Sequence, residues 1–429
     1  MTSEQAVGEQ RGRSVKRRRV VSVLAAGAVS IGLVSTGFTG AGAQPSVRGV
    51  TDNSIDVAGL IQAAQFAKSD VETGAKAAFD AAGPINGRKI NYVETADDKG
   101  DANTDLSEAR RLVQQDKVFA ILPVLTPVLG QAAKLFEQQH VPFLGWGIAE
   151  SWCDNSYGFA ITGCIVPPGN IPNTGDTWGR LLDRYYKAKG ESGSKGKTAA
   201  VVTEDNDTGK RGLEEIVFQA KKAGFKIVYQ KSALPAPPAV IGDYSPYAND
   251  ILTSNNGKAP DVAYVVVSGI NVLGLAKALK DANYSGVITD AVSYDPRLVA
   301  RASGEAVFAQ FDLPESSKPG ISKVVDDLKA AGATSITQPM LAAYFSADMF
   351  IRILKKVGKN LTPEAFSKAA SKFTYQIKDT IGPTKYPKAF KQGAPCGTLV
   401  QSDGTKYDIA VPYGCYSNYN YKSGKKLKY

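Results

Sequence analysis

From residue 54 onward, short apolar runs alternate with longer amphipathic stretches. The runs have the length of strands, and the stretches between them repeat apolar residues at helical spacing. This alternation is typical of strand–helix–strand units around a parallel sheet. The first round predicts strands at 54–61, 88–96, 118–125 and 142–147, separated by helices at 70–82, 101–115 and 128–139.

A second round follows the segment VPPGNIPNTG at 166–175, which we interpret as a crossover between domains. Its predicted strands lie at 198–205, 225–234, 262–267, 286–290 and 306–313, and its predicted helices at 174–189, 210–223, 243–254 and 271–282. Two rounds in 429 residues predict an α/β protein with two doubly wound parallel-sheet lobes. The stretch 318–372 is helical in pattern and must pack back onto one lobe, so the chain crosses between the lobes more than once.

The first 43 residues have the pattern of a secretory signal. Basic residues between Arg11 and Arg19 precede the apolar run VVSVLAAGAVSIGLV, and Ala41-Gly42-Ala43 offers a small-residue cleavage site. We expect a signal peptide at 1–43 and export to the periplasm, the cell envelope or the medium, by the general or the twin-arginine route. A retained anchor is the alternative, although the apolar run is short for a membrane span.

The charge of the exported chain is only mildly basic. Removal of six basic and two acidic residues with the signal lowers the formal net charge from +10 to +6. Part of that excess lies in the tail at 422–428, and no basic stripe is interleaved with aromatic residues. The sequence therefore predicts no nucleic-acid partner.

The four cysteines are expected to form disulfides, because export places them in an oxidising compartment. They show no Cys-x-x-Cys spacing of the kind that binds zinc or carries redox chemistry. Three pairings are open, and the local one joins Cys153 with Cys164 and Cys396 with Cys415. We expect these bonds to stabilise the fold rather than to catalyse a reaction.

The sequence shows no catalytic machinery. The chain has a single histidine, so multi-histidine zinc sites are excluded and any Ser-His-Asp or Cys-His arrangement would depend on His140. Neither a Gly-x-Ser-x-Gly elbow nor a Gly-x-Gly-x-x-Gly fingerprint occurs. We therefore predict a protein that is not an enzyme and needs no cofactor or metal.

A binding site can still be predicted, because ligands of open parallel sheets bind beyond the carboxyl ends of the strands. The residues at the predicted strand ends, which are our candidate ligand-binding residues, are Phe66, Thr126, Trp146, Gly147, Asp207, Thr208, Ser268 and Asp290.

Two of these candidates have an alternative interpretation. Thr126 followed by Pro127 predicts the start of a helix, whose free N–H groups attract anions, but Thr126 is equally consistent with a cap that binds no ligand. Trp146 lies between two glycines, which expose backbone and ring together, and a Trp in the hydrophobic core is the alternative.

The chain resembles the type I periplasmic binding proteins of the leucine/isoleucine/valine-binding branch. The resemblance rests on SIDVAGLI, TGAKAAFDAAGPINGRKINYVETADDKGD, ARRLVQQDKVFAILPVLTPV and VPFLGWG, which occur in this order. It implies two lobes joined by three crossovers, with lobe 1 at 47–168 and 315–383 and lobe 2 at 169–314 and 384–429. It also implies a ligand held between the lobes and delivery to a membrane permease driven by an ATPase.

The resemblance is imperfect at the pocket. Thr126 stands where the family usually has a Ser, and Pro127 next to it has no N–H to offer. Ala149 stands where a second hydroxyl usually helps to hold the amino-acid head group. Thr208 stands where an aromatic residue of the second lobe often closes the pocket. Asp290 aligns approximately with the acidic partner of a ligand amine. Fewer donors for a carboxylate argue against a simple branched-chain amino acid.

We therefore predict a monomeric, exported solute-binding protein of an ABC importer, which closes over a small amphipathic or amino-acid-like ligand. A secreted α/β hydrolase that uses Asp207 and Asp290 is the alternative from another class. A receptor ectodomain is a third possibility, weakened because no second apolar span follows the signal.

Overall fold

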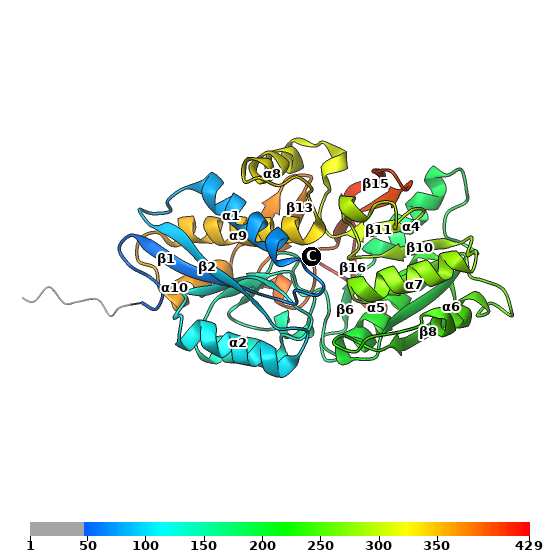
Figure 1. Ribbon diagram of the computed structural model, residues 1–429, viewed down its shortest axis with the longest axis horizontal. Helices are drawn as coiled ribbons and strands as arrows, with labels where there is room; N and C mark the ends of the chain where they lie inside the picture. The colour runs from blue at the N-terminus through cyan, green and yellow to red at the C-terminus, as the bar shows by residue number, and fades with distance from the viewer. Residues whose placement is uncertain (1–46) are drawn as a thin grey trace, which may run out of the picture. The chain divides into compact units, whose positions relative to one another are not determined.

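The computed structural model describes residues 47–429, so the predicted signal peptide at 1–43 lies outside the described residues. Two large sheets organise the described part of the chain (Figure 1). The first sheet has the order β2-β1-β3-β4-β5 and is parallel throughout. Its strands are β1 (Ser54–Ile61), β2 (Lys89–Asp97), β3 (Ala120–Leu125), β4 (Phe143–Gly145) and β5 (Gly158–Ala160).

The second sheet has the order β15-β14-β11-β10-β9-β7-β8. Its last five members are parallel, whereas β14 and β15 add an antiparallel hairpin at the edge. Its strands are β7 (Thr198–Glu204), β8 (Lys226–Leu234), β9 (Val262–Val266), β10 (Val287–Asp290), β11 (Ala306–Ala309), β14 (Cys396–Ser402) and β15 (Tyr407–Cys415). The sequence pattern predicts the parallel strands but not the hairpin.

Helices cover both faces of each sheet. In the first lobe, apolar residues of α1 and α9 form one core with the sheet, and those of α2 and α3 form another. In the second lobe, α4 and α5 cover one face and α6 and α7 the other. These helices are α1 (Lys68–Ala82), α2 (Ala102–Gln114), α3 (Gly130–Gln138), α4 (Thr177–Ala188), α5 (Asp207–Ala223), α6 (Ser245–Leu252), α7 (Gly269–Asp281) and α9 (Gln338–Val357). Both lobes are therefore doubly wound, as predicted.

The helical stretch near the C-terminus returns to the first lobe. It forms α8 (Pro319–Ala330), α9 and α10 (Pro363–Ala370), and Figure 1 shows α9, in orange, beside α1, in blue. The two helices approach closely because Gly74 has no side chain: a Cβ there would lie 2.1 Å from the carbonyl oxygen of Met340. This packing confirms that 318–372 folds back onto a lobe.

One helix start differs from the prediction. Helix α3 begins at Gly130, and its N-cap residue Leu129 forms no side-chain cap. Thr126 Oγ1 instead accepts a hydrogen bond from the N–H of Val128 at 3.2 Å, within the turn that precedes the helix. The prediction of Thr126 as the cap of this helix is therefore wrong.

Three connections join the two sheets, and β13 (Ile381–Lys385), in the third connection, lies between the other two. Thr384 Oγ1 donates to the carbonyl of Ile161 in the first connection at 2.5 Å. In the second, the N–H of Asp312 donates to the carbonyl of Thr380 at 2.7 Å. Strand β13 also pairs with β12 (Thr374–Ile377). The connections therefore form one hydrogen-bonded structure.

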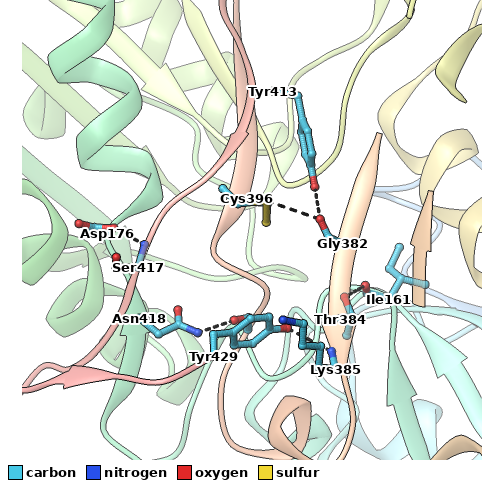
Figure 2. The surroundings of a disulfide bond; sticks show 12 residues. Ile161, Asp176, Gly382, Thr384, Lys385, Cys396, Tyr413, Ser417, Asn418 and Tyr429 are labelled. Atoms are coloured by element: carbon cyan, nitrogen blue, oxygen red, sulfur yellow. Dashed lines mark hydrogen bonds between the residues drawn. A yellow bond between two sulfur atoms is a disulfide. The ribbon is translucent and has the colours of Figure 1, made fainter. Parts of the chain in front are cut away.

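A small sheet continues this region. It joins β6 (Asn173–Gly175) of the first connection with β16 (Asn418–Asn420) and β17 (Lys426–Leu427) of the C-terminal segment. Figure 2 shows the adjoining bonds: the N–H of Ser417 donates to Asp176 at 3.0 Å, and the N–H of Lys385 to the hydroxyl of Tyr429 at 3.3 Å.

The disulfides have the local pairing among the three that the sequence allows. Cys153 is bonded to Cys164, and Cys396 to Cys415. The second bond closes the open end of the β14–β15 hairpin, where Cys415 Sγ lies 3.6 Å from the carbonyl oxygen of Gly382. Tyr413 Oη donates to the same carbonyl at 2.9 Å. This bond therefore stabilises the contact between the hairpin and β13.

We predict that the double substitution of Cys396 and Cys415 by Ala lowers the free energy of unfolding by about 3 kcal/mol, because the bond closes a loop in the unfolded chain. The separation of 19 residues exceeds the 11 residues between Cys153 and Cys164, so the matching double variant of that pair should lose no more. Urea unfolding followed by circular dichroism measures both losses. Equal stability of the Cys396/Cys415 variant and the oxidised wild type would contradict the prediction.

Candidate functional site

A cavity of about 220 Å³ lies at the carboxyl ends of strands from both sheets. Residues that follow β3 and β4 form its wall in the first lobe, and residues at the ends of β7, β9, β10 and β11 form its wall in the second. The connections complete it through 164–166, 174–175, 393–396 and Asn418, and the start of α4 adds Thr177 and Trp178. The site therefore lies where parallel α/β sheets place their ligands.

Trp146 is the main aromatic side chain of the first lobe at this cavity. Its ring packs between Phe66 and Phe311, with centroid distances of 6.3 and 5.9 Å. The indole Nε1 is buried and has no hydrogen-bond partner within residues 47–429. Trp146 is thus both a core residue and a cavity residue, and its N–H can serve a ligand.

Trp178 and Phe308 form an aromatic wall in the second lobe. Their rings stack at a centroid distance of 5.1 Å and an interplanar angle of 23°. Trp178 Nε1 donates to Thr289 Oγ1 at 3.0 Å, which fixes the ring against β10. The indole N–H of Trp178 therefore already has its hydrogen-bond partner, and the two rings offer the ligand an apolar surface for stacking.

Glu204 ends β7 at the cavity and already has partners. Its Oε1 accepts the N–H of Ser268 at 2.9 Å and the side-chain amide of Asn271 at 2.8 Å. Ser268 is the N-cap residue of α7, so the carboxylate lies at the positive end of that helix. This protein group therefore occupies a place that an anionic ligand would otherwise favour.

Glu215 reaches the cavity from α5, beside the hydroxyl of Thr174, and has no cationic partner in the described chain. Its side chain is almost fully buried, and Oε1 has no hydrogen-bond partner in the described chain. Burial raises the pKa of Glu215 well above its usual value, because a charged carboxylate loses its hydration there. Arg211, one turn earlier, lies 3.5 Å from Glu214 rather than pairing with Glu215.

The structure brings three of the predicted site residues together at the cavity. Trp146, Thr208 and Ser268 line it. Phe66 lies behind Trp146 rather than on the surface of the cavity. Gly147 packs against the first connection, where an added Cβ would lie 2.3 Å from the carbonyl oxygen of Gly163.

The remaining predicted residues lie elsewhere. Thr126 is fully buried in its turn, and its neighbour Pro127 lines the cavity instead. Asp207 is exposed on the first turn of α5. Asp290 bonds its own turn, accepting from the N–H and hydroxyl of Ser293 at 2.7 and 2.6 Å. The carboxylates that the hydrolase alternative requires are therefore not in this cavity.

Several lining residues were not predicted from the sequence, among them Trp178, Phe308, Glu204 and Glu215. Glu204 is the last residue of β7 and follows the same strand-end rule as the residues chosen next to it. Glu215 lies beside the buried Ile216 on the inner face of α5, so its helical spacing was an available signal.

A pair of buried carboxyl groups lies in the first lobe and does not line the cavity. Asp98 follows β2, and Asp105 lies on α2. Burial raises the pKa of Asp98 to about 6 and that of Asp105 to about 8, with the neighbouring carboxyl group adding to the effect at Asp105. Within residues 47–429, neither carboxyl oxygen of Asp105 forms a hydrogen bond.

This pair predicts a loss of stability with rising pH. The folded chain binds the protons of Asp98 and Asp105 more tightly than the unfolded chain does. Their contribution to the free energy of unfolding is therefore fully present below about pH 4 and is lost as the pH rises through about 8. Asp105→Asn should therefore raise the melting temperature at pH 8 more than at pH 4.5. Thermal unfolding across pH measures this, with the exposed Asp80→Asn as the control. An equal change at both pH values would contradict the prediction.

Within residues 47–429, no group of three or more His, Cys, Asp or Glu side chains is placed to hold a metal ion. Over the same residues, none of the helices combines the length and the apolar character that a bilayer crossing requires.

The chain was compared with known families and proteins. The family model described as periplasmic binding protein matches residues 57–406. No curated protein matches the chain. Because the family model spans most of the sequence, the chain belongs to the periplasmic binding protein family, and the family suggested by the sequence is confirmed.

Solved structures share the fold at low sequence identity. A fatty acid ABC transporter substrate-binding protein from Thermomonospora curvata has a TM-score of 0.67 at 16% identity, covering 86% of this chain and 94% of its own. A solute-binding protein from R. palustris in complex with 4-hydroxybenzoate has a TM-score of 0.66 at 17% identity, and the match covers 85% of this chain and 98% of that protein. A leucine-binding protein from Thermotoga maritima has a TM-score of 0.64 at 14% identity, and the match covers 83% of this chain and 97% of that protein.

Proposed function

We propose that this protein is the extracytoplasmic solute-binding component of an ABC importer, which captures a small amphipathic or amino-acid-like ligand between its lobes. The observation that carries this is the cavity itself, because the carboxyl ends of both sheets contribute to it and neither lobe forms it alone. Membership of the periplasmic binding protein family supports the same function over the hydrolase alternative.

The partners follow from this function. An importer of this class consists of a permease and its ATPase, to which a monomeric, exported binding protein delivers its ligand. Proteins of the same fold are described as binding benzoates, fatty acid or leucine, so the fold accepts apolar and amphipathic ligands. The aromatic wall of Trp178 and Phe308 supports a ligand with an apolar body.

The three connections act as the hinge in this proposal. Lobe 1 consists of 47–168 and 315–383, and lobe 2 of 169–314 and 384–429. Because β13 is bonded to both other connections, rotation of the lobes requires the connections to bend together. Hinge closure of two lobes around a ligand is a known mode of motion in binding proteins of this kind.

One ion pair joins the proposed lobes on the side of α1. Arg297, which follows β10, donates to both carboxylate oxygens of Asp70, at 2.6 and 3.2 Å. Thr337 Oγ1, at the start of α9, donates to the same carboxylate at 2.9 Å. Asp70 is almost fully buried, so its carboxylate is shielded from solvent, whereas the Arg297 side chain is partly exposed. We infer that this contact favours the closed arrangement.

We predict that Arg297→Gln weakens ligand binding about fivefold, because the bidentate contact across the lobes is lost. Small-angle scattering should also show a larger radius of gyration for this variant without ligand. Arg352→Gln is the matched control, because Arg352 pairs with Asp348 inside α9. A variant that keeps both affinity and radius would show that the Asp70–Arg297 pair does not act on closure.

We also predict that Trp146→Phe weakens the tightest ligand of a calorimetric panel by more than tenfold, about 1.4 kcal/mol, because Trp146 lines the cavity and its indole N–H has no partner in the described chain. Trp152→Phe is the matched control: Trp152 Nε1 is also buried without a partner in the described chain, but it does not line the cavity. Equal losses of affinity in the two variants would show that the Trp146 indole N–H does not bind the ligand. Conversion of the bound compound to a product would instead favour an enzyme.

A further inference from the structure

The unsatisfied polar atoms of the cavity are mostly hydrogen-bond acceptors. Within residues 47–429, the lining side-chain atoms that are buried without a partner are Trp146 Nε1, Thr177 Oγ1, Glu215 Oε1, Ser268 Oγ, Gln310 Oε1 and Asn418 Oδ1. The oxygens of Gln310 and Asn418 accept hydrogen bonds, and so does the Glu215 carboxyl once a ligand cation holds it in the ionised form. The two hydroxyls both donate and accept, and only the indole is an obligate donor. A ligand that satisfies this set must bring N–H or O–H groups.

The amide of Asn418 is fixed in this orientation. Its Nδ2 donates to Gln392 Oε1 at 3.1 Å and to the carbonyl of Gly393 at 2.8 Å, so its Oδ1 is the atom left free. Figure 2 shows Asn418 on the C-terminal strand beside the third connection. This acceptor therefore lies where the connections meet the second lobe.

The charge of the cavity is one-sided. Among its lining residues, all of which belong to the described chain, two are glutamates and none is Lys, Arg or His. Glu204 is already compensated by Asn271 and by the start of α7, whereas Glu215 has no cationic partner of its own. A ligand carboxylate would meet no counter-charge here, and a buried ion without one is costly.

The remaining walls suit a cation with an apolar body. Trp146, Trp178 and Phe308 present aromatic rings, and ring faces attract ammonium groups as well as apolar surface. We propose that the cavity binds an organic amine that carries an apolar body and no carboxylate, with Glu215 as its counter-ion and Gln310 and Asn418 as acceptors. This inference rests on the proposed solute-binding function and specifies the ligand class.

The test compares three probes of matched size: 2-phenylethylamine, 3-phenylpropanoate and phenylalanine. Calorimetry should give the amine at least tenfold tighter binding than either other probe. Glu215→Gln, which keeps the shape and removes the charge, should weaken amine binding more than tenfold. Glu214→Gln is the matched control, because Glu214 is exposed on the same helix turn and should leave the affinity unchanged.

Gln310→Met provides a second variant at another strand end, so the test does not depend on Glu215 alone. It should weaken the amine and leave the melting temperature of the free protein nearly unchanged, because Gln310 has no partner for Oε1 in the described chain.

Three outcomes would overturn the ligand class: tighter binding of 3-phenylpropanoate or phenylalanine, no binding of the amine, or unchanged amine binding in both Glu215→Gln and Gln310→Met. Tight binding of the carboxylate with compaction in solution scattering would still support the solute-binding function. A library of amines, neutral compounds and carboxylates with no binder would contradict that function as well.

Discussion

The hydrogen bonds on the two sides of β13 are the constraint on which the cavity depends. Thr384 binds the first connection, and the carbonyl of Thr380 binds the second, so three chain segments between the sheets are fastened into one structure. The Cys396–Cys415 bond and Tyr413 add the hairpin of the second sheet to it through Gly382. Because the cavity draws its walls from both sheets and from these segments, their relative positions decide its shape.

Much of this fold could be predicted from the sequence, because most of the parallel strands are buried along their length and leave continuous apolar runs. That pattern identified the helices and the strands from 54 to 309, except β5 and β6, which have three residues each and were not predicted. The hairpin of β14 and β15 was not predicted: no α-helix links it to the preceding strand, and β15, at the edge of the sheet, mixes buried and exposed positions. Pairing at an edge is decided by tertiary contact rather than by the local pattern.

The site was less predictable, because the strand-end rule gives the segment but not the direction of each side chain. Asp290 ends β10 and Ser268 follows β9, yet Asp290 bonds its own turn and Ser268 lines the cavity. Trp178 is the second residue of α4, and Asn418 belongs to β16 of the C-terminal segment, so neither residue lies at the end of a parallel strand. A rule based on sheets alone therefore does not find them.

The distribution of charge between the lobes links binding to closure. Glu204 and Glu215 belong to the strand and helix elements of the second lobe, and Trp146 follows a strand of the first. Closing the lobes over an empty cavity leaves the Glu215 carboxyl and the Trp146 indole desolvated and unpartnered, which costs about 1–3 kcal/mol for each group. A ligand that supplies a donor to one and stacks on the other removes that cost. Selectivity then arises at closure, because a ligand that leaves Glu215 unpaired does not stabilise the closed state.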